Sequence, residues 1–134
     1  MNLNDDLITA CRIGNLELVC LCLRNGADVE AWNNYTVRRA ATNGRLEVVK
    51  LLIENGADIT ARDNEAVRWA VDTGHLEVVK LLIQNGADVT TWNNLAVRWA
   101  ADNGHLEVVD FINEYIKNID IYQQIFEIIK QEGL

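Results

Sequence analysis

Histidines are the first side chains to consider for chemistry, because they act as bases and bind metal ions at neutral pH. His75 and His105 are the only two in the chain, and each follows a glycine in nearly the same local sequence, TGHLEVV and NGHLEVV. Equivalent places in neighbouring helical units lie about 8–10 Å apart, whereas bonds to a zinc ion are only about 2 Å long. We therefore expect the two histidines to brace loops by hydrogen bonds and not to share a metal.

The cysteines do not suggest a site either. The chain has three cysteines, Cys11, Cys20 and Cys22, and no Cys-x-x-Cys motif. Because the number is odd and the motif is missing, we expect neither a disulfide framework nor a metal site. Cys20 and Cys22 fall on different faces of a predicted helix. Three free thiols fit a reducing compartment, and we expect an intracellular, cytoplasmic protein.

No set of side chains in the sequence forms a recognisable catalytic or cofactor site. The chain has no Gly-rich phosphate loop, no Gly-x-Ser-x-Gly and no His-Glu-x-x-His. Carboxylates are frequent, but most fall in the first or last turn of a predicted helix, where water solvates them. We therefore expect no enzyme, no catalytic residue, no cofactor and no metal.

Two series of glycines show how the chain is built. Both have a period of 30 residues, and a shared period indicates a tandem repeat. The first series is Gly14, Gly44, Gly74 and Gly104, and the second is Gly26, Gly56 and Gly86.

Residues 63–90 show the unit most clearly, and they predict two short helices. Apolar side chains recur at helical spacing over 65–72 and again over 76–84. Gly74 and Gly86 suit the left-handed residue that ends a helix. Two short helices cannot bury so much apolar surface alone, so the units must stack on one another.

Three runs of sequence resemble the ankyrin repeat, namely NGRLEVVKLLIENGADI (43–59), TGHLEVVKLLIQNGADV (73–89) and NGHLEVV (103–109). The resemblance implies an all-α ankyrin-repeat solenoid of four stacked helix-turn-helix repeats with a C-terminal capping helix. The family period is about 33 residues, so we expect the hairpin between these shorter repeats to be blunted. The combination of NNxAVRWA with NGHLEVV is also similar to ankyrin proteins of giant viruses that infect amoebae, which would place the protein in a host cytoplasm.

We expect one domain over residues 1–134, with repeats at 1–30, 31–60, 61–90 and 91–118. Repeat 4 lacks the second glycine, so its outer helix is expected to run longer. Residues 119–134 resemble a truncated fifth inner helix, which we expect to cap repeat 4; the alternative is docking of a partner or a second copy. Inner helices are expected to be capped by the equivalent asparagines Asn4, Asn34, Asn64 and Asn94.

In the ankyrin resemblance, inner helices and turns line a concave surface that binds a partner protein. Tryptophan and arginine at such places have the composition of binding hot spots. The alternative, which we weight equally, is that these side chains belong to the scaffold; Arg38, Arg68 and Arg98 recur unchanged, which favours a scaffold role for that column. The candidate partner-binding residues are Trp32, Arg62 and Trp92 in the turns, Tyr35, Glu65 and Leu95, then Arg39, Trp69 and Trp99, and finally Asp72 and Asp102.

The formal charge of −8 argues against a nucleic-acid surface, which needs lysine and arginine to neutralise phosphates. The longest apolar run, Leu18–Leu23, is too short to span a membrane, and the first ten residues do not resemble a signal peptide. We therefore predict a non-catalytic protein-protein interaction module, expected to be a monomer. The alternative is a structural or self-associating element, with a homodimer formed through the C-terminal helix.

Overall fold

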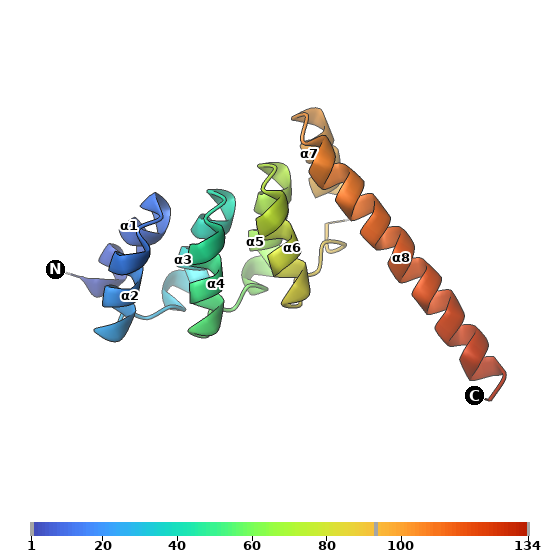
Figure 1. Ribbon diagram of the computed structural model, residues 1–134, viewed down its shortest axis with the longest axis horizontal. Helices are drawn as coiled ribbons and strands as arrows, with labels where there is room; N and C mark the ends of the chain where they lie inside the picture. The colour runs from blue at the N-terminus through green and yellow to red at the C-terminus, as the bar shows by residue number, and fades with distance from the viewer. Residues whose placement is uncertain (1, 93, 134) are drawn as a thin grey trace.

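The computed structural model describes residues 2–92 and 94–133, and within them the chain forms helices joined by turns, with no strand. Helices come in antiparallel pairs that stack side by side, with the two termini at opposite ends of the stack (Figure 1). The expected fold class is confirmed. In chain order the helices are α1 (Leu3–Ile13), α2 (Leu16–Arg24), α3 (Ala31–Thr42), α4 (Leu46–Glu54), α5 (Ala61–Asp72), α6 (Leu76–Gln84), α7 (Leu95–Asp102) and α8 (Leu106–Gln131).

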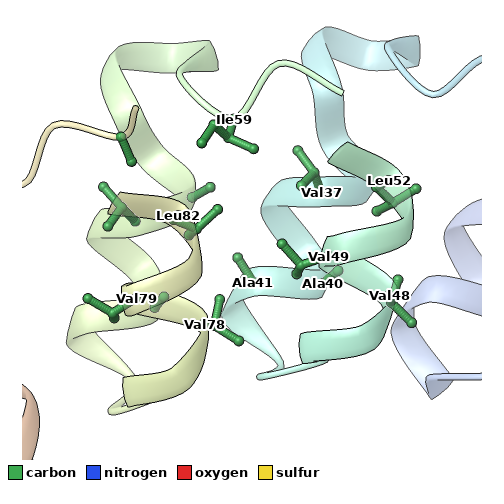
Figure 2. Close-up of a cluster of buried hydrophobic side chains, with 14 of the residues drawn as sticks. Val37, Ala40, Ala41, Val48, Val49, Leu52, Ile59, Val78, Val79 and Leu82 are labelled. Carbon is green, nitrogen blue, oxygen red and sulfur yellow. The ribbon is translucent and has the colours of Figure 1, made fainter. Parts of the chain in front are cut away.

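The core lies between the inner helices (α1, α3, α5, α7) and the outer helices (α2, α4, α6, α8). Each inner helix contacts the next along the stack, and each outer helix packs on its own inner helix. In Figure 2, Val49 of α4 lies beside the small residue Ala40 of α3, and Leu82 of α6 lies in the next repeat. Alanine on the inner helices lets neighbouring repeats approach closely, so that the larger side chains of the outer helices fill the space between them.

Gly44 and Gly74 follow the inner helices with φ of +69° and +80°, as the sequence predicts. The structure adds a second reason for glycine at both places. A Cβ on Gly44 would collide with the ring of His75 from the next repeat, and a Cβ on Gly74 would collide with His105. The histidines therefore join repeats by packing on a bare backbone. We had expected a loop-bracing hydrogen bond; the contact found is a packing contact between repeats.

The asparagine column has a different role from the expected N-caps. The Oδ1 atoms of Asn4, Asn34 and Asn64 accept hydrogen bonds from the backbone N–H groups of residues 28, 58 and 88, at 2.7, 2.7 and 2.9 Å. Helix α1 is capped by Asn2 instead. Each asparagine thus ties down the turn that leaves its own repeat, 24 residues further along. Asn94 would reach residue 118, but there the chain continues as helix α8.

Helix α8 departs most from the expected layout. It runs without a break through residue 118, because repeat 4 lacks the glycine that ends the other outer helices. A C-terminal helix is present as expected. It is not a separate helix but the C-terminal half of α8, and it extends away from the stack (Figure 1). Its side chains are exposed from Ile121 onward, Tyr122 to 71%. Within this chain, the described residues 121–133 therefore do not cover repeat 4; Leu134 lies outside the described residues.

Candidate partner-binding surface

The turns that enter repeats 2 and 3 have an unusual backbone. Residues 32–34 have φ of +51° to +60°, and residues 62–64 have φ of +55° to +62°, so each turn is a short left-handed helical segment. Such a conformation is unfavourable for residues other than glycine, although asparagine and aspartate tolerate it. Trp32 lies at the start of the first turn, and 52% of this residue is exposed to solvent. This compact turn stands where a longer repeat would project a hairpin.

Arg38 holds the first of these turns in place. Its guanidinium is buried and donates hydrogen bonds to the carbonyl oxygens of Trp32 and Asn33, both at 3.1 Å. A third donor, Nη1, lies 2.5 Å from a carboxylate oxygen of Glu65 in the next repeat. The planar fork of arginine supplies several donors in fixed directions. One side chain therefore fixes a turn and joins two repeats, which is a scaffold role.

Glu65 was a candidate contact residue, and the structure corrects that assignment. Only 6% of the residue is exposed, so it is not available to a partner. Besides Arg38, its carboxylate lies 3.6 Å from Nη2 of Arg68 and 3.8 Å from Nε of Arg62. Charged groups are buried only when they are paired, and here three guanidinium groups surround one carboxylate. Arg68 is therefore paired with a carboxylate of its own helix.

Trp92 is half-buried and braces repeats 3 and 4. Its indole N–H donates to the carbonyl oxygen of Asp63, at 2.9 Å, in the second left-handed turn. The guanidinium of Arg68 lies over its ring, 4.2 Å from the ring centre. Arginine stacked on tryptophan in this way contributes about 0.5–2 kcal/mol. Trp92 therefore has the contacts of a scaffold residue, although part of its surface stays accessible.

The inner-helix row remains on the surface to different extents. Arg39 of α3 and Trp69 of α5 are half-buried, and Trp99 of α7 is 40% exposed. One turn later, Asp72 is half-buried and accepts a hydrogen bond from the side-chain amide of Asn103 at 3.3 Å. Asp102 is exposed. Because these residues occupy equivalent places in stacked helices, they lie on one side of the stack.

The remaining candidates divide in the same way. Tyr35 is half-buried, with the Arg38 guanidinium 5.4 Å from its ring centre. Leu95 is 37% exposed, and Arg62 is exposed as well. The structure thus brings ten of the eleven candidates to the surface in whole or in part; Glu65 is the exception. Sequence reasoning missed the buried Arg38–Glu65 pair, and the only signal for it was the arginine that recurs in repeats 2, 3 and 4.

The two buried cysteines, Cys11 and Cys22, are not reactive. Burial, aided by nearby Cys22, raises the pKa of Cys11 to about 12, and burial also raises the pKa of Cys22. Both thiols therefore stay protonated and inert at neutral pH. Within the described residues, no group of three His, Cys, Asp or Glu side chains is placed to hold a metal ion. None of the helices described here is long and apolar enough to cross a membrane.

Comparison with known proteins agrees with the repeat architecture. Residues 4–63 and 63–125 match a family model described as ankyrin repeats in three copies. No curated protein sequence matches the chain. The two matched segments together run from residue 4 in α1 to residue 125 in α8.

Proposed function

Because the chain belongs to the ankyrin-repeat family, whose members generally bind other proteins, we propose that it is a non-catalytic module that binds a partner protein on the inner-helix side of the stack. The observation that carries the proposal is the exposure of two tryptophans, 40% for Trp99 on the inner helix α7 and 52% for Trp32 in the turn that enters repeat 2. Tryptophan is among the residues that are enriched in binding hot spots. Free thiols at all three cysteines suit a reducing, intracellular location.

The proposed contact surface consists of an aromatic centre with acids beside it. Trp69 and Trp99 stand in one row, with Asp72 and Asp102 a turn further along the same helices. Arg39 completes the row at its other end. The matching partner surface therefore offers apolar or basic side chains that can lie on the indoles and reach the carboxylates. The net charge of −8 favours encounter with such a surface.

The experiment compares a double variant, Trp69→Leu with Trp99→Leu, against the unchanged chain in affinity purification from the cells that contain it. Leucine keeps the apolar character of the position, so the fold should persist. The matched control is Glu47→Gln with Glu77→Gln, which alters two exposed residues on the outer helices. A protein captured by the control and the unchanged chain, but not by the tryptophan variant, identifies the partner.

The captured protein is then titrated against the purified chains by calorimetry. We expect the tryptophan variant to bind at least about 30-fold more weakly, since removing a hot-spot side chain costs about 2 kcal/mol or more. Circular dichroism and thermal unfolding of the variant check that it remains folded. Equal affinity in a folded tryptophan variant would contradict the proposed surface.

A further inference from the structure

Helix α8 carries an exposed apolar surface beyond the repeats, which we call the distal face: Ile121, Tyr122, Ile125, Phe126, Ile128 and Ile129. Their exposed fractions run from 42% to 71%. At 100° of rotation per residue, the distal face spans about 160° of the helix circumference, wider than the seam of a two-helix coiled coil. A face this wide fits a surface made of two helices and not a single helix.

The same molecule has a second exposed surface at the end of repeat 4. Its members, which we call the end face, are Leu95, Arg98, Ala101 and Leu106. At the junction of repeats 3 and 4 the equivalent positions are covered: Glu65 is 6% and Val71 is 1% exposed, whereas Leu95 is 37% exposed and Ala101 lies open. The end face belongs to two helices, α7 and the start of α8. It is therefore a surface made of two helices, as the width of the distal face requires.

A lipid surface is a poor occupant for the distal face. Interfacial helices that bind membranes are rich in lysine and arginine, which meet anionic lipid headgroups. From Ile119 to Gly133 this helix carries Asp120, Glu127 and Glu132 against a single basic residue, Lys130. The whole chain is also acidic, with a formal charge of −8. Electrostatic repulsion would therefore oppose membrane binding.

We propose that two copies of this chain form a dimer about a two-fold axis, with the distal face of each α8 covering the end face of the other copy. The two α8 helices run antiparallel, and α7 and α8 of both copies make a four-helix arrangement. Each copy supplies both a docking helix and a docking surface, which is the self-complementarity that a two-fold interface needs. Neither surface is covered by the copy that bears it.

The area is sufficient for a stable dimer. Covering both distal faces and both end faces removes on the order of 1,500 Å² of accessible surface, within the ~1,200–2,000 Å² that specific interfaces bury. Two aromatic side chains per copy, Tyr122 and Phe126, belong to the contact, and buried aromatic side chains contribute strongly to binding. The inner-helix row proposed for partner binding lies outside this contact, apart from its last members on α7.

The first test measures the mass of the full-length chain in solution by sedimentation velocity and light scattering, from nanomolar to high micromolar concentration. The variant Phe126→Lys with Ile129→Lys places two charges in the distal face. The control, Gln124→Lys with Gln131→Lys, adds the same charges to the polar side of the same helix. We expect the unchanged chain and the control to dimerise, and the dissociation constant of the distal-face variant to rise at least about 100-fold.

The second test checks the reciprocal arrangement. Ala101→Glu spoils the end face of a chain whose distal face is intact, and the residue is exposed in the single copy, so folding should not suffer. Neither this variant nor the distal-face variant can form a good contact with itself, but a mixture of the two restores one complete contact. Native mass spectrometry of the mixture should show more mixed dimer than either pure dimer. A monomer at every concentration, a distal-face variant that dimerises as well as the control, or an absence of mixed dimers would each overturn the proposal.

Discussion

Arg38 shows how one side chain can hold an unfavourable backbone. The left-handed turn at residues 32–34 points two carbonyl oxygens toward the interior, and the guanidinium of Arg38 satisfies both. Both hydrogen bonds are part-buried, and a bond of this kind contributes about 0.5–1.5 kcal/mol to stability. The turn and its arginine therefore depend on one another, and the pairing with Glu65 extends this dependence to the next repeat.

Removing the carboxylate of this pair should be costly. Glu65→Ala removes the carboxylate that pairs with Arg38, while the Arg38 charge stays buried, with 4% of the residue exposed. Removing one member of a buried ion pair costs about 3–5 kcal/mol. We expect the midpoint of urea unfolding to fall accordingly. Glu77→Ala is the control, because Glu77 pairs with Lys80 at the surface, where such pairs contribute little. If both substitutions shifted the midpoint equally, the buried network would not stabilise the fold.

At the scale of the elements, the end of α3 and the start of α4 depend on a close contact with the next repeat. Gly44→Ala forces alanine into a left-handed conformation, at about 1–2 kcal/mol, and also pushes its Cβ against the ring of His75. Gly56→Ala has the same backbone problem, with φ of +91°, but open space around the Cβ. We therefore expect Gly44→Ala to lower the unfolding free energy more than Gly56→Ala.

A double-mutant cycle separates the two causes. Adding His75→Ala removes the ring that the new Cβ meets, so the Gly44→Ala substitution should cost less in that background than in the unchanged chain. The remaining cost should approach that of Gly56→Ala. Strictly additive effects of the two substitutions, measured by chemical unfolding, would mean that the ring moves aside freely.

The exposure of α8 changes what truncation is expected to do. The sequence predicts that deletion of residues 119–134 opens repeat 4, but the described side chains from Ile121 onward lie in solvent. A chain that ends at Asp120 should therefore keep its unfolding free energy within about 1 kcal/mol when it is measured as a monomer. Hydrogen exchange of the truncated chain is the measurement. Faster exchange across α7 in the shortened monomer would show that the tail covers repeat 4 after all.

At the scale of the whole molecule, stability should not be uniform along the stack. Helix α5 buries six residues and α7 only two, Ala96 and Ala100, because α5 packs between α3 and α7, whereas α7 contacts one inner helix, α5, in the part of the chain that the structure describes. In stacked repeats each unit is stabilised by its neighbours, so terminal units open first. We expect amides in α7 to exchange earlier than those of Val49 in α4 and Val79 in α6. Uniform protection from end to end would indicate a fully cooperative unit.

Much of the fold could be predicted from the sequence, because its strongest signals are local. The glycine at position 74 marks a helix end, and the apolar spacing over 76–84 gives the limits of α6 as the structure has them. The left-handed turns could not be predicted in this way. Asn34 and Asn64 precede a helical pattern and therefore suggest N-caps. In the structure, their side chains instead accept hydrogen bonds from backbone N–H groups of a turn 24 residues further along.

The candidate surface was predicted less well, because burial depends on contacts between repeats. Position 65 differs from its counterparts Tyr35 and Leu95, and such variation is typical of a binding surface. Only the proximity of Arg38, 27 residues earlier, explains why a glutamate is buried there. The tryptophan at 92 raised the same difficulty, since its indole N–H is directed to the turn of the preceding repeat.

The hydrogen bonds from Asn34 and Asn64 to the turns 24 residues further along, here called the asparagine braces, limit how such a chain can change in length. Each brace joins a repeat to the turn that follows it, and each histidine packs on the glycine 31 residues before it (75−44 and 105−74). If a gene segment of 30 codons were duplicated in frame, the added unit would bring its own asparagine, glycine and histidine in the correct register. An insertion of any other length would break the asparagine hydrogen bond to the turn and the packing of the histidine ring on its glycine. Recombination that adds or removes whole units should therefore be tolerated by selection, whereas smaller insertions inside the helices should be eliminated.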